Sequence, residues 1–257
     1  MAEQKTVTLN VTRFDPDTDA APREQAYTIP FRDDMVVLDA LNYIKEHVDG
    51  SVTFRWSCRM GVCGSCGMNV NGTPKLTCAT FCKEYTTEAI RVEPLANFPV
   101  VRDLVVDMTD FMGKLKAVQP WLIRKDEQPV SQGEYRQSPD QLERFRQYSM
   151  CINCMLCYAA CPVYALSPAF VGPAALALAR RYNLDSRDQG EADRHDLVAS
   201  EEGIWECTFV GECTVVCPKH VDPAAAIQQA KVDTVTKYWK NILMPWMNKP
   251  AAVGAKS

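Results

Sequence analysis

Long apolar runs are missing from this chain of 257 residues. No stretch approaches the roughly 18 consecutive apolar residues of a transmembrane helix candidate, so we do not expect the chain to span a membrane by itself. An excess of basic charge is missing as well, because 28 basic residues stand against 32 acidic ones and the net charge is −4. This balance argues against a nucleic acid as the main partner.

Motifs for targeting, nucleotide binding and hydrolytic chemistry are also absent from the sequence. Residues 1–5 lead into an alternating segment with no apolar signal region, so we do not expect secretion. There is no Walker motif and no GxGxxG after a strand. The three histidines, His47, His195 and His220, lie in no nucleophile or zinc-protease pattern. We therefore predict that this chain contains no catalytic residue of its own.

Cysteine, in contrast, is abundant. Twelve thiols would indicate disulfides in a secreted chain. Without a signal peptide we expect the reducing cytosol, where cysteines clustered at spacings of a few residues indicate metal sites. The cysteines lie at positions 58, 63, 66, 78, 82, 151, 154, 157, 161, 207, 213 and 217.

The first part of the chain has the pattern of a small mixed-sheet domain. Apolar residues alternate over 7–11, and a second candidate strand covers 26–31. The apolar spacing over 37–48 predicts a helix. The Asn71-Gly72 pair is a strong hairpin signal, and residues 90–95 predict a last strand.

The rest of the chain has a helical pattern. A helix is predicted over 103–118, and a connector with two prolines over 119–137. Ser138-Pro139 and Asp222-Pro223 each place a capping residue before a proline at the first helical position. Further helices are predicted over 174–182 and 224–240. The later cysteines are therefore expected in loops between helices.

The first group of cysteines has the spacing of plant-type [2Fe–2S] ferredoxins, Cys58-x4-Cys63-x2-Cys66 followed by Cys78. Four thiolates converge on two irons only if the loop wraps tightly, which the glycines between them permit. A zinc knuckle is the alternative, but zinc sites usually have two CxxC pairs, which this spacing does not match. Cys82 is left over, and we interpret it as a buried free thiol.

The remaining cysteines form two runs of the bacterial two-cluster ferredoxin type, in which the fourth cysteine of a run serves the other cluster. The runs are Cys151-x2-Cys154-x2-Cys157-x3-Cys161-Pro162 and Cys207-x5-Cys213-x3-Cys217-Pro218. A [4Fe–4S] cluster is then held by Cys151, Cys154, Cys157 and Cys217. The other cluster has three thiolates, Cys161, Cys207 and Cys213, and Val210 occupies the slot of the fourth ligand.

Valine cannot ligate iron, so we expect a [3Fe–4S] cluster at this second site. Zinc is one alternative, and a [4Fe–4S] cluster with a non-protein fourth ligand is another, which would imply hydratase chemistry at an exposed iron. Three clusters in a chain that has no nucleotide-binding motif indicate electron transfer. The clusters would pass electrons between sites in other subunits. A free-standing ferredoxin-like redox sensor or shuttle is the alternative of a different class.

Four segments resemble the iron–sulfur subunit of succinate dehydrogenase and fumarate reductase. They are residues 55–67 around the first cysteines, residues 151–162, Ser186-Arg187-Asp188 and Cys217-Pro218-Lys219. The resemblance extends over residues 6–240 and its motifs are specific. It implies an α+β chain, with a plant-type ferredoxin-like (β-grasp) [2Fe–2S] domain over 1–105. An all-helical, bacterial-ferredoxin-like domain over 106–257 follows, with the [4Fe–4S] and [3Fe–4S] clusters.

The resemblance also implies partners. These are a flavoprotein subunit with covalent FAD and the dicarboxylate site, one or two hydrophobic membrane-anchor subunits, and a quinone near the three-iron cluster. The chain would then be a peripheral protein on the cytoplasmic face of the bacterial inner membrane. Residues 238–246 mix aromatic and basic side chains, and they are expected at the lipid–water boundary, on the anchor, or as an ordinary packed tail.

Two departures from the ubiquinone-linked succinate dehydrogenases resemble bacterial quinol:fumarate reductases. Residues 163–166 lack the tryptophan pair typical of the former, and Thr208 stands where they often have histidine. The resemblance then implies that electrons pass from menaquinol to FAD, where fumarate becomes succinate. The reverse direction, succinate:quinone oxidoreduction, would use the same series of clusters. The implied menaquinone site consists of Pro162, Thr208, Phe209, Gln228 and Lys231. Without the resemblance, Lys231 would be interpreted as a solvated surface lysine.

Overall fold

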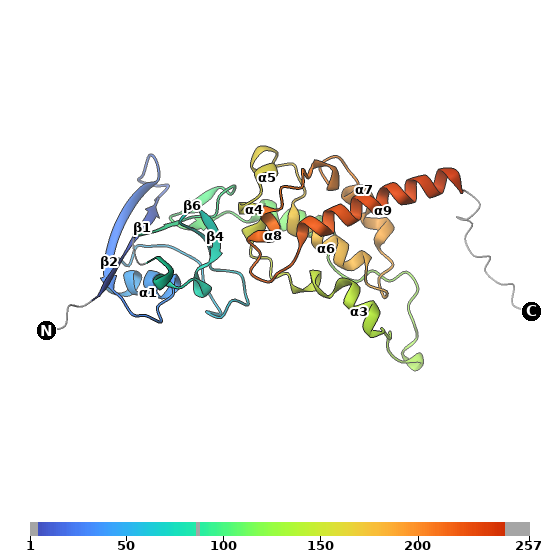
Figure 1. Ribbon diagram of the computed structural model, residues 1–257, viewed down its shortest axis with the longest axis horizontal. Coiled ribbons are helices and arrows are strands. Elements are labelled where there is room, and N and C mark those ends of the chain that lie inside the picture. Colours follow the sequence, from blue (N-terminus) through green and yellow to red (C-terminus); the bar gives the residue numbers. More distant parts are fainter. Residues whose placement is uncertain (1–4, 86–87, 245–257) are drawn as a thin grey trace, which may run out of the picture.

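The computed structural model describes residues 5–85 and 88–244 of the chain. A sheet and one helix form one end of the molecule, and helices form the other end, with the last helix projecting beyond the body (Figure 1). The predicted α+β class, with the strands first and the helices second, is confirmed. Within the described residues, no helix is both long enough and apolar enough to cross a membrane.

The N-terminal part is a mixed five-stranded sheet in the order β2-β1-β5-β3-β4. Its strands are β1 (Thr6–Arg13), β2 (Arg23–Pro30), β3 (Gly67–Val70), β4 (Thr73–Leu76) and β5 (Ile90–Glu93). β1 pairs antiparallel with β2 and parallel with β5. The alternating residues Leu9 and Val11 of β1 are fully buried, so the predicted half-buried strand is confirmed.

Two local predictions in this part are confirmed in detail. Asn71 and Gly72 both have positive φ, +47° and +80°, and they connect β3 to β4 as a two-residue hairpin. Helix α1 (Val37–His47) buries Val37, Leu41 and Ile44. These side chains pack in the same core cluster as β1 because they recur on one face of the helix.

The helix predicted over 103–118 is wrong in its first turns. Residues 100–106 form a small hairpin, β6 (Val100–Arg102) and β7 (Val105–Val106), and helix α2 (Thr109–Ala117) begins only afterwards. Asp103 has φ +46°, and its carboxylate accepts hydrogen bonds from Arg13 Nε at 3.0 Å and from the Phe14 N–H at 2.9 Å. These distant partners fix the segment as a turn. The predicted last strand is shorter than expected as well, because β5 ends at Glu93.

The C-terminal part is helical, as predicted. The helices are α3 (Pro139–Arg146), α4 (Leu156–Ala159), α5 (Pro162–Leu166), α6 (Pro173–Asn183), α7 (Glu191–Val198), α8 (Glu212–Val215) and α9 (Pro223–Leu243). Short 3₁₀ helices cover Thr77–Ala79, Cys82–Tyr85, Val130–Gln132, Tyr148–Met150 and Ile204–Glu206. The side chains of Ser138 and Asp222 accept hydrogen bonds from the Gln141 and Ala225 N–H groups, so both predicted N-caps are confirmed.

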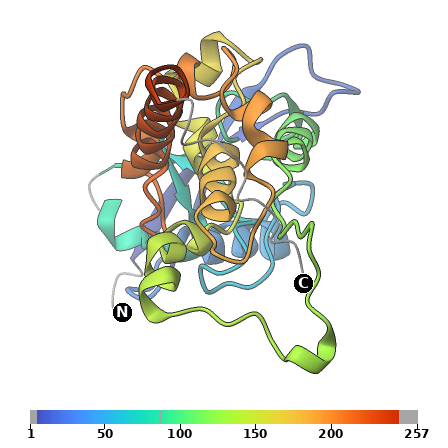
Figure 2. The same cartoon turned by 90° about the vertical axis from the view of Figure 1, so that its right-hand side faces the viewer.

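The later cysteines lie mostly in loops or at helix ends, as expected, but Cys157 lies within α4 and Cys213 within α8. α6 and α9 lie side by side, and an Arg180–Asp233 ion pair links them (Figure 2). The connector over 119–137 swings out as a long loop from the helical part (Figures 1 and 2). One buried cluster contains Phe98 and Phe111 together with Leu156, Tyr158 and Tyr164, so the N-terminal and helical parts share a core. The domain boundary at 105/106 stays a prediction.

Candidate metal centres

The first cysteine loop lies between α1 and β3 and presents backbone N–H groups to sulfur. Cys58 Sγ accepts hydrogen bonds at 3.3–3.4 Å from the N–H groups of Met60, Val62 and Cys63. The N–H of Gly61 donates to Cys78 Sγ at 3.3 Å. Positive φ values at Arg59, Gly61 and Gly64 produce this wrapping. N–H groups pointing at sulfur are one means by which proteins tune the reduction potential of such a cluster.

The thiols of this loop are in opposite electrostatic environments. The backbone N–H of Cys58 and the hydroxyl of Ser65 lower the pKa of the Cys63 thiol to about 6. Burial, together with the neighbouring thiols of Cys66 and Cys58, raises the pKa of Cys78 to about 11. Backbone contacts link predicted ligands within this loop, because the Cys58 N–H also donates to Cys63 Sγ at 3.5 Å. Binding of a metal centre here would release protons.

The second candidate site, which we call the second cavity, is lined by the four cysteines assigned to the [4Fe–4S] cluster, Cys151, Cys154, Cys157 and Cys217. Ile152, Leu156 and Ala174 complete its apolar wall. Burial raises the pKa of the Cys154 thiol to about 12 and that of Cys157 well above its usual value. The structure therefore brings Cys217 to the first run across a long sequence separation, as the ferredoxin template predicts.

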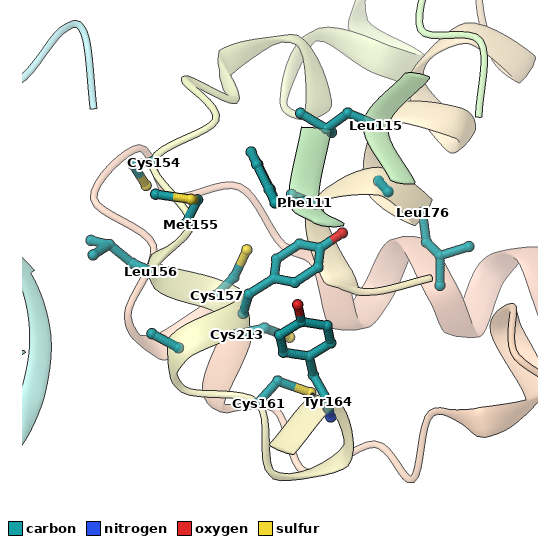
Figure 3. Close-up of a cluster of buried hydrophobic side chains, with 14 of the residues drawn as sticks. Phe111, Leu115, Cys154, Met155, Leu156, Cys157, Cys161, Tyr164, Leu176 and Cys213 are labelled. Atoms are coloured by element: carbon teal, nitrogen blue, oxygen red, sulfur yellow. Dashed lines mark hydrogen bonds between the residues drawn. The ribbon is translucent and has the colours of Figure 1, made fainter. Parts of the chain in front are cut away.

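The third cavity is lined by Cys161, Cys207 and Cys213, the three cysteines assigned to the second ferredoxin-like cluster. Val210 lies on the same wall, and 56% of its surface is exposed. Cys161 Sγ accepts a hydrogen bond from the Tyr164 N–H, and Cys207 Sγ accepts one from the Phe209 N–H, both at 3.4 Å. Figure 3 shows Cys157, Cys161 and Cys213 together with Tyr164 inside the shared core.

The five residues predicted to bind quinone lie around Cys207. Pro162, Thr208 and Phe209 line the same cavity as the three cysteines. Gln228 Nε2 lies 4.0 Å from Cys207 Sγ, and Lys231 Nζ donates to the Cys207 carbonyl oxygen at 2.7 Å. Sequence reasoning missed Trp205, whose ring lies 5.8 Å from Lys231 Nζ. Its only sequence signal is its position two residues before a cysteine.

The donor sets fit iron–sulfur clusters. In the part of the chain that the structure describes, no three His, Cys, Asp or Glu side chains are arranged around a single metal ion. Cysteine side chains line two mostly apolar cavities, and the sulfur atoms of Cys58, Cys78, Cys161 and Cys207 accept hydrogen bonds from backbone N–H groups. Cys82 lies apart from these loops in the core under the sheet. It is 1% exposed, and burial raises the pKa of its thiol to about 12, so the predicted burial is confirmed, whereas its role as a free thiol stays a prediction.

The first two cysteine loops pack directly on each other. A Cβ atom at Gly64 would lie 2.9 Å from Cys154 Cβ and 2.9 Å from the Ile152 carbonyl oxygen. At Gly67 it would lie 3.0 Å from a methyl carbon of Leu156. Sequence reasoning used these glycines to explain the wrapping of the loop but missed their contact with the helical part. No local pattern reports such an approach, because its two sides are far apart in the chain.

Comparison with known proteins supports the same assignment. Residues 8–113 match the model of a 2Fe-2S iron-sulfur cluster binding domain, and residues 147–221 match that of a 4Fe-4S dicluster domain. A fumarate reductase iron-sulfur subunit of Mycobacterium tuberculosis is 60% identical over 93% of this chain and 97% of its own length. One from Escherichia coli is 51% identical over 95% of this chain and 100% of its own length.

A solved structure has the same fold. The chain matches a subunit of the Mycobacterium smegmatis Sdh1 complex in the apo form, with a TM-score of 0.76 and 30% identity. The match covers 92% of this chain and 98% of that one. Both ferredoxin-like parts of the predicted fold class are thereby confirmed, as is the family suggested by the motifs. The chain belongs to the family of fumarate reductase and succinate dehydrogenase iron–sulfur subunits and is an electron-transfer subunit.

Proposed function

We propose that this chain is the iron–sulfur subunit of a membrane-bound quinol:fumarate reductase. In this role it connects menaquinol with the FAD of a flavoprotein subunit that reduces fumarate to succinate. The observation that carries the proposal is the series of three cysteine-lined sites, with the predicted quinone residues beside Cys207 of the last one. Relatives named fumarate reductase iron-sulfur subunits support the direction.

The cysteines would hold three clusters. The ligands are Cys58, Cys63, Cys66 and Cys78 for [2Fe–2S], Cys151, Cys154, Cys157 and Cys217 for [4Fe–4S], and Cys161, Cys207 and Cys213 for [3Fe–4S]. Such clusters, when bound, accept and release single electrons. The protein's own contribution is to bury the thiols, to direct N–H groups at sulfur and to hold the first two loops in contact.

Val210 determines the type of the outer cluster in this proposal. We expect the oxidised native protein to show the spin signal of a three-iron cluster. Val210→Cys should convert some or all of this cluster to [4Fe–4S], because the side chain at position 210 already lines the cavity. The reduction potential of the cluster should fall, because it depends on the cluster type. Mössbauer spectroscopy after gentle anaerobic isolation checks both forms. A four-iron cluster in the wild type would contradict the assignment and favour the hydratase alternative.

Lys231 supplies a positive charge and N–H donors beside Cys207. Its amine uses one N–H on the Cys207 carbonyl oxygen, and an ammonium group has three donors in total. A remaining donor can hydrogen-bond a quinone carbonyl, and the bond strengthens as negative charge develops there. Gln228 lies one helical turn away, on the same face of α9, and its amide also points towards Cys207.

The test compares two lysines of the same helix in the intact membrane complex. Lys231→Ala should slow quinol oxidation, at least several-fold, but leave dicarboxylate turnover with an artificial dye largely intact. Lys237→Ala is the matched control, because Lys237 is exposed and pairs with Glu191 instead. Equal loss in both assays would indicate an assembly defect. Unchanged quinol activity in Lys231→Ala would remove Lys231 from the site.

Two exposed apolar areas support the proposed partners. Trp56, Met60 and Val62 protrude from the first cysteine loop, where a flavoprotein subunit would receive electrons. Near the last cluster site, Leu166 and Phe209 are exposed and would face the membrane anchor. Such patches on a soluble surface commonly mark interaction sites. Purification should therefore yield this chain with a flavoprotein and one or two hydrophobic subunits, whereas a redox sensor would purify alone.

We place the chain as a peripheral protein on the cytoplasmic face of the membrane, and the exposed side chains of helix α9 support contact with a membrane surface. Its exposed residues Val235, Tyr238, Trp239 and Ile242 lie on the same side of the helix as Lys231. Aromatic and basic residues together are typical of the lipid–water boundary. Tyr238, Trp239, Ile242 and Leu243 are exposed at the end of α9, and Pro245 and Trp246 of the predicted segment lie outside the described residues.

The reverse reaction, succinate oxidation by quinone, is the second candidate. A mitochondrial succinate dehydrogenase iron-sulfur subunit from Oryza sativa is 41% identical over 87% of this chain and 73% of its own length. The absence of a tryptophan pair at 163–166 and the presence of Thr208 favour fumarate reduction. Identification of the quinone in the extracted complex, together with initial rates in both directions, distinguishes the two.

A further inference from the structure

Asn97 lies in the N-terminal part but binds the backbone between two cysteines of the helical part. Its Nδ2 is 3.0 Å from the carbonyl oxygens of Tyr158 and Ala159 and 3.3 Å from that of Cys161. We propose that Asn97 is a positioning residue, which fixes the cysteine loops of the helical part against the first cysteine loop. The proposal deepens the electron-transfer role, and its functional meaning rests on the proposed function.

The chemistry of the contact requires an amide donor. All three neighbours are carbonyl oxygens, which only accept hydrogen bonds, so the NH₂ side of the amide must face them. Helix α4 ends at Ala159, and the last carbonyl groups of a helix have no partners within it. Asn97 therefore supplies a donor to the Ala159 carbonyl oxygen at the end of α4. It adds a second donor to the Tyr158 and Cys161 carbonyl oxygens, which also accept from the Cys161 and Ala165 N–H groups.

The position of the amide is itself well fixed. Asn97 has φ +67°, a conformation that asparagine tolerates better than most residues. Leu95 and Phe98 on either side are 2% and 8% exposed and belong to the core shared by both parts. The ring of Phe98 lies 5.8 Å from that of Tyr164. The amide thus has little freedom to move away from the carbonyl groups.

The segment that Asn97 holds connects two predicted cluster sites. Cys157 lines the second cavity and Cys161 lines the third, and only Tyr158, Ala159 and Ala160 lie between them. On the other side of the interface, Gly64 approaches Cys154 without any intervening side chain. Asn97 and Gly64 therefore define two separate points of contact between the N-terminal part and the cysteine loops. Because electron tunnelling slows steeply with distance, a looser contact would slow transfer between the parts.

The chain offers a matched pair of asparagine-to-aspartate variants. Asn71 also has positive φ, +47°, but its Oδ1 accepts a hydrogen bond from the Arg91 N–H at 2.7 Å. Aspartate at 71 can accept the same bond, whereas aspartate at 97 cannot donate when ionised and would repel the three carbonyl groups. Asn97→Asp and Asn71→Asp thus add the same charge to the same part, with opposite consequences for hydrogen bonding.

The experiment uses the purified complex with its clusters. We expect Asn97→Asp to retain iron and sulfide, but to weaken the magnetic interaction between the first cluster and its neighbour in electron paramagnetic resonance spectra. Electron arrival at the outer cluster after rapid chemical reduction of the first should slow at least several-fold, as followed by freeze-quench spectroscopy. Asn71→Asp should match the wild type in both measurements. An unchanged magnetic interaction and transfer rate in Asn97→Asp would overturn the proposal.

A second variant covers the case in which Asn97→Asp fails to assemble. Asn97→Ala removes the donor without adding charge, and it should show a smaller change in the same direction. Loss of clusters in both Asn97 variants, with Asn71→Asp intact, would make Asn97 a folding residue and overturn the positioning role. Failure of the proposed function would appear differently, as a wild-type complex without fumarate reduction, because the magnetic measurement depends on neither quinone nor fumarate.

Discussion

Gly64 allows a sensitive test of the contact between the first two cysteine loops. Its φ is +75°, and a Cβ there would lie 2.9 Å from both Cys154 Cβ and the Ile152 carbonyl oxygen. Forcing an alanine into positive φ costs roughly 1–2 kcal/mol. Overpacking a tight contact costs about 1–3 kcal/mol more. We therefore expect Gly64→Ala to destabilise the protein by about 2–5 kcal/mol.

Gly61 provides a control for the free-energy cost of backbone strain alone. It has φ +67° in the same loop, but nothing lies within 4 Å of an added Cβ atom. Gly61→Ala should therefore cost only the backbone strain, about 1–2 kcal/mol. The N–H of Gly61 that donates to Cys78 Sγ is retained in the alanine variant. The difference between the two variants isolates the contact between the loops.

The assay is thermal unfolding of the cluster-containing complex, read from cluster absorbance. For a chain of this size, 1 kcal/mol corresponds to a shift of roughly 2–4 °C in the midpoint. Gly64→Ala should thus unfold well below Gly61→Ala, and it should also alter the magnetic interaction between the first two clusters. Equal midpoints and unchanged spectra in both variants would refute the inference that the loops are in direct contact.

Two further predictions concern the buried Arg194–Asp188 pair, whose side chains are 0% and 1% exposed. Arg194→Met should destabilise the protein by about 3–5 kcal/mol, because it leaves a buried carboxylate unpaired; a thermal midpoint close to that of the wild type would contradict this. The second prediction concerns pH. Burial alone raises the pKa of Asp188, but hydrogen bonds from Arg194 and from backbone N–H groups lower it below its usual value overall. A carboxyl group with a lowered pKa stabilises the fold above its unfolded pKa of about 3.9, so this contribution should disappear as the pH falls below about 4. Acid titrations of wild type and Asp188→Asn check it, and identical profiles would exclude Asp188 as a contributor.

Local sequence patterns determined much of this protein. The alternation in β1, the Asn71-Gly72 hairpin and the caps at Ser138 and Asp222 are confirmed, because each depends on residues within a few positions of one another. The spacing of the cysteines predicted three sites in the same way. Even the pairing of Cys217 with the first run was predictable, because the ferredoxin template carries the long-range information that the local pattern lacks.

Tertiary contacts decided the rest. Apolar spacing predicted a helix from residue 103, but Asp103 binds Arg13 and Phe14, and Leu104 is buried in the core under the sheet. Likewise, no pattern near Asn97 indicates that its amide meets the carbonyl groups beyond Cys157. Lys231 resembles a solvated lysine until the fold brings it to Cys207. In each case the partner is far away in the sequence. The contact that stabilises the structure is therefore not reflected in any local sequence pattern.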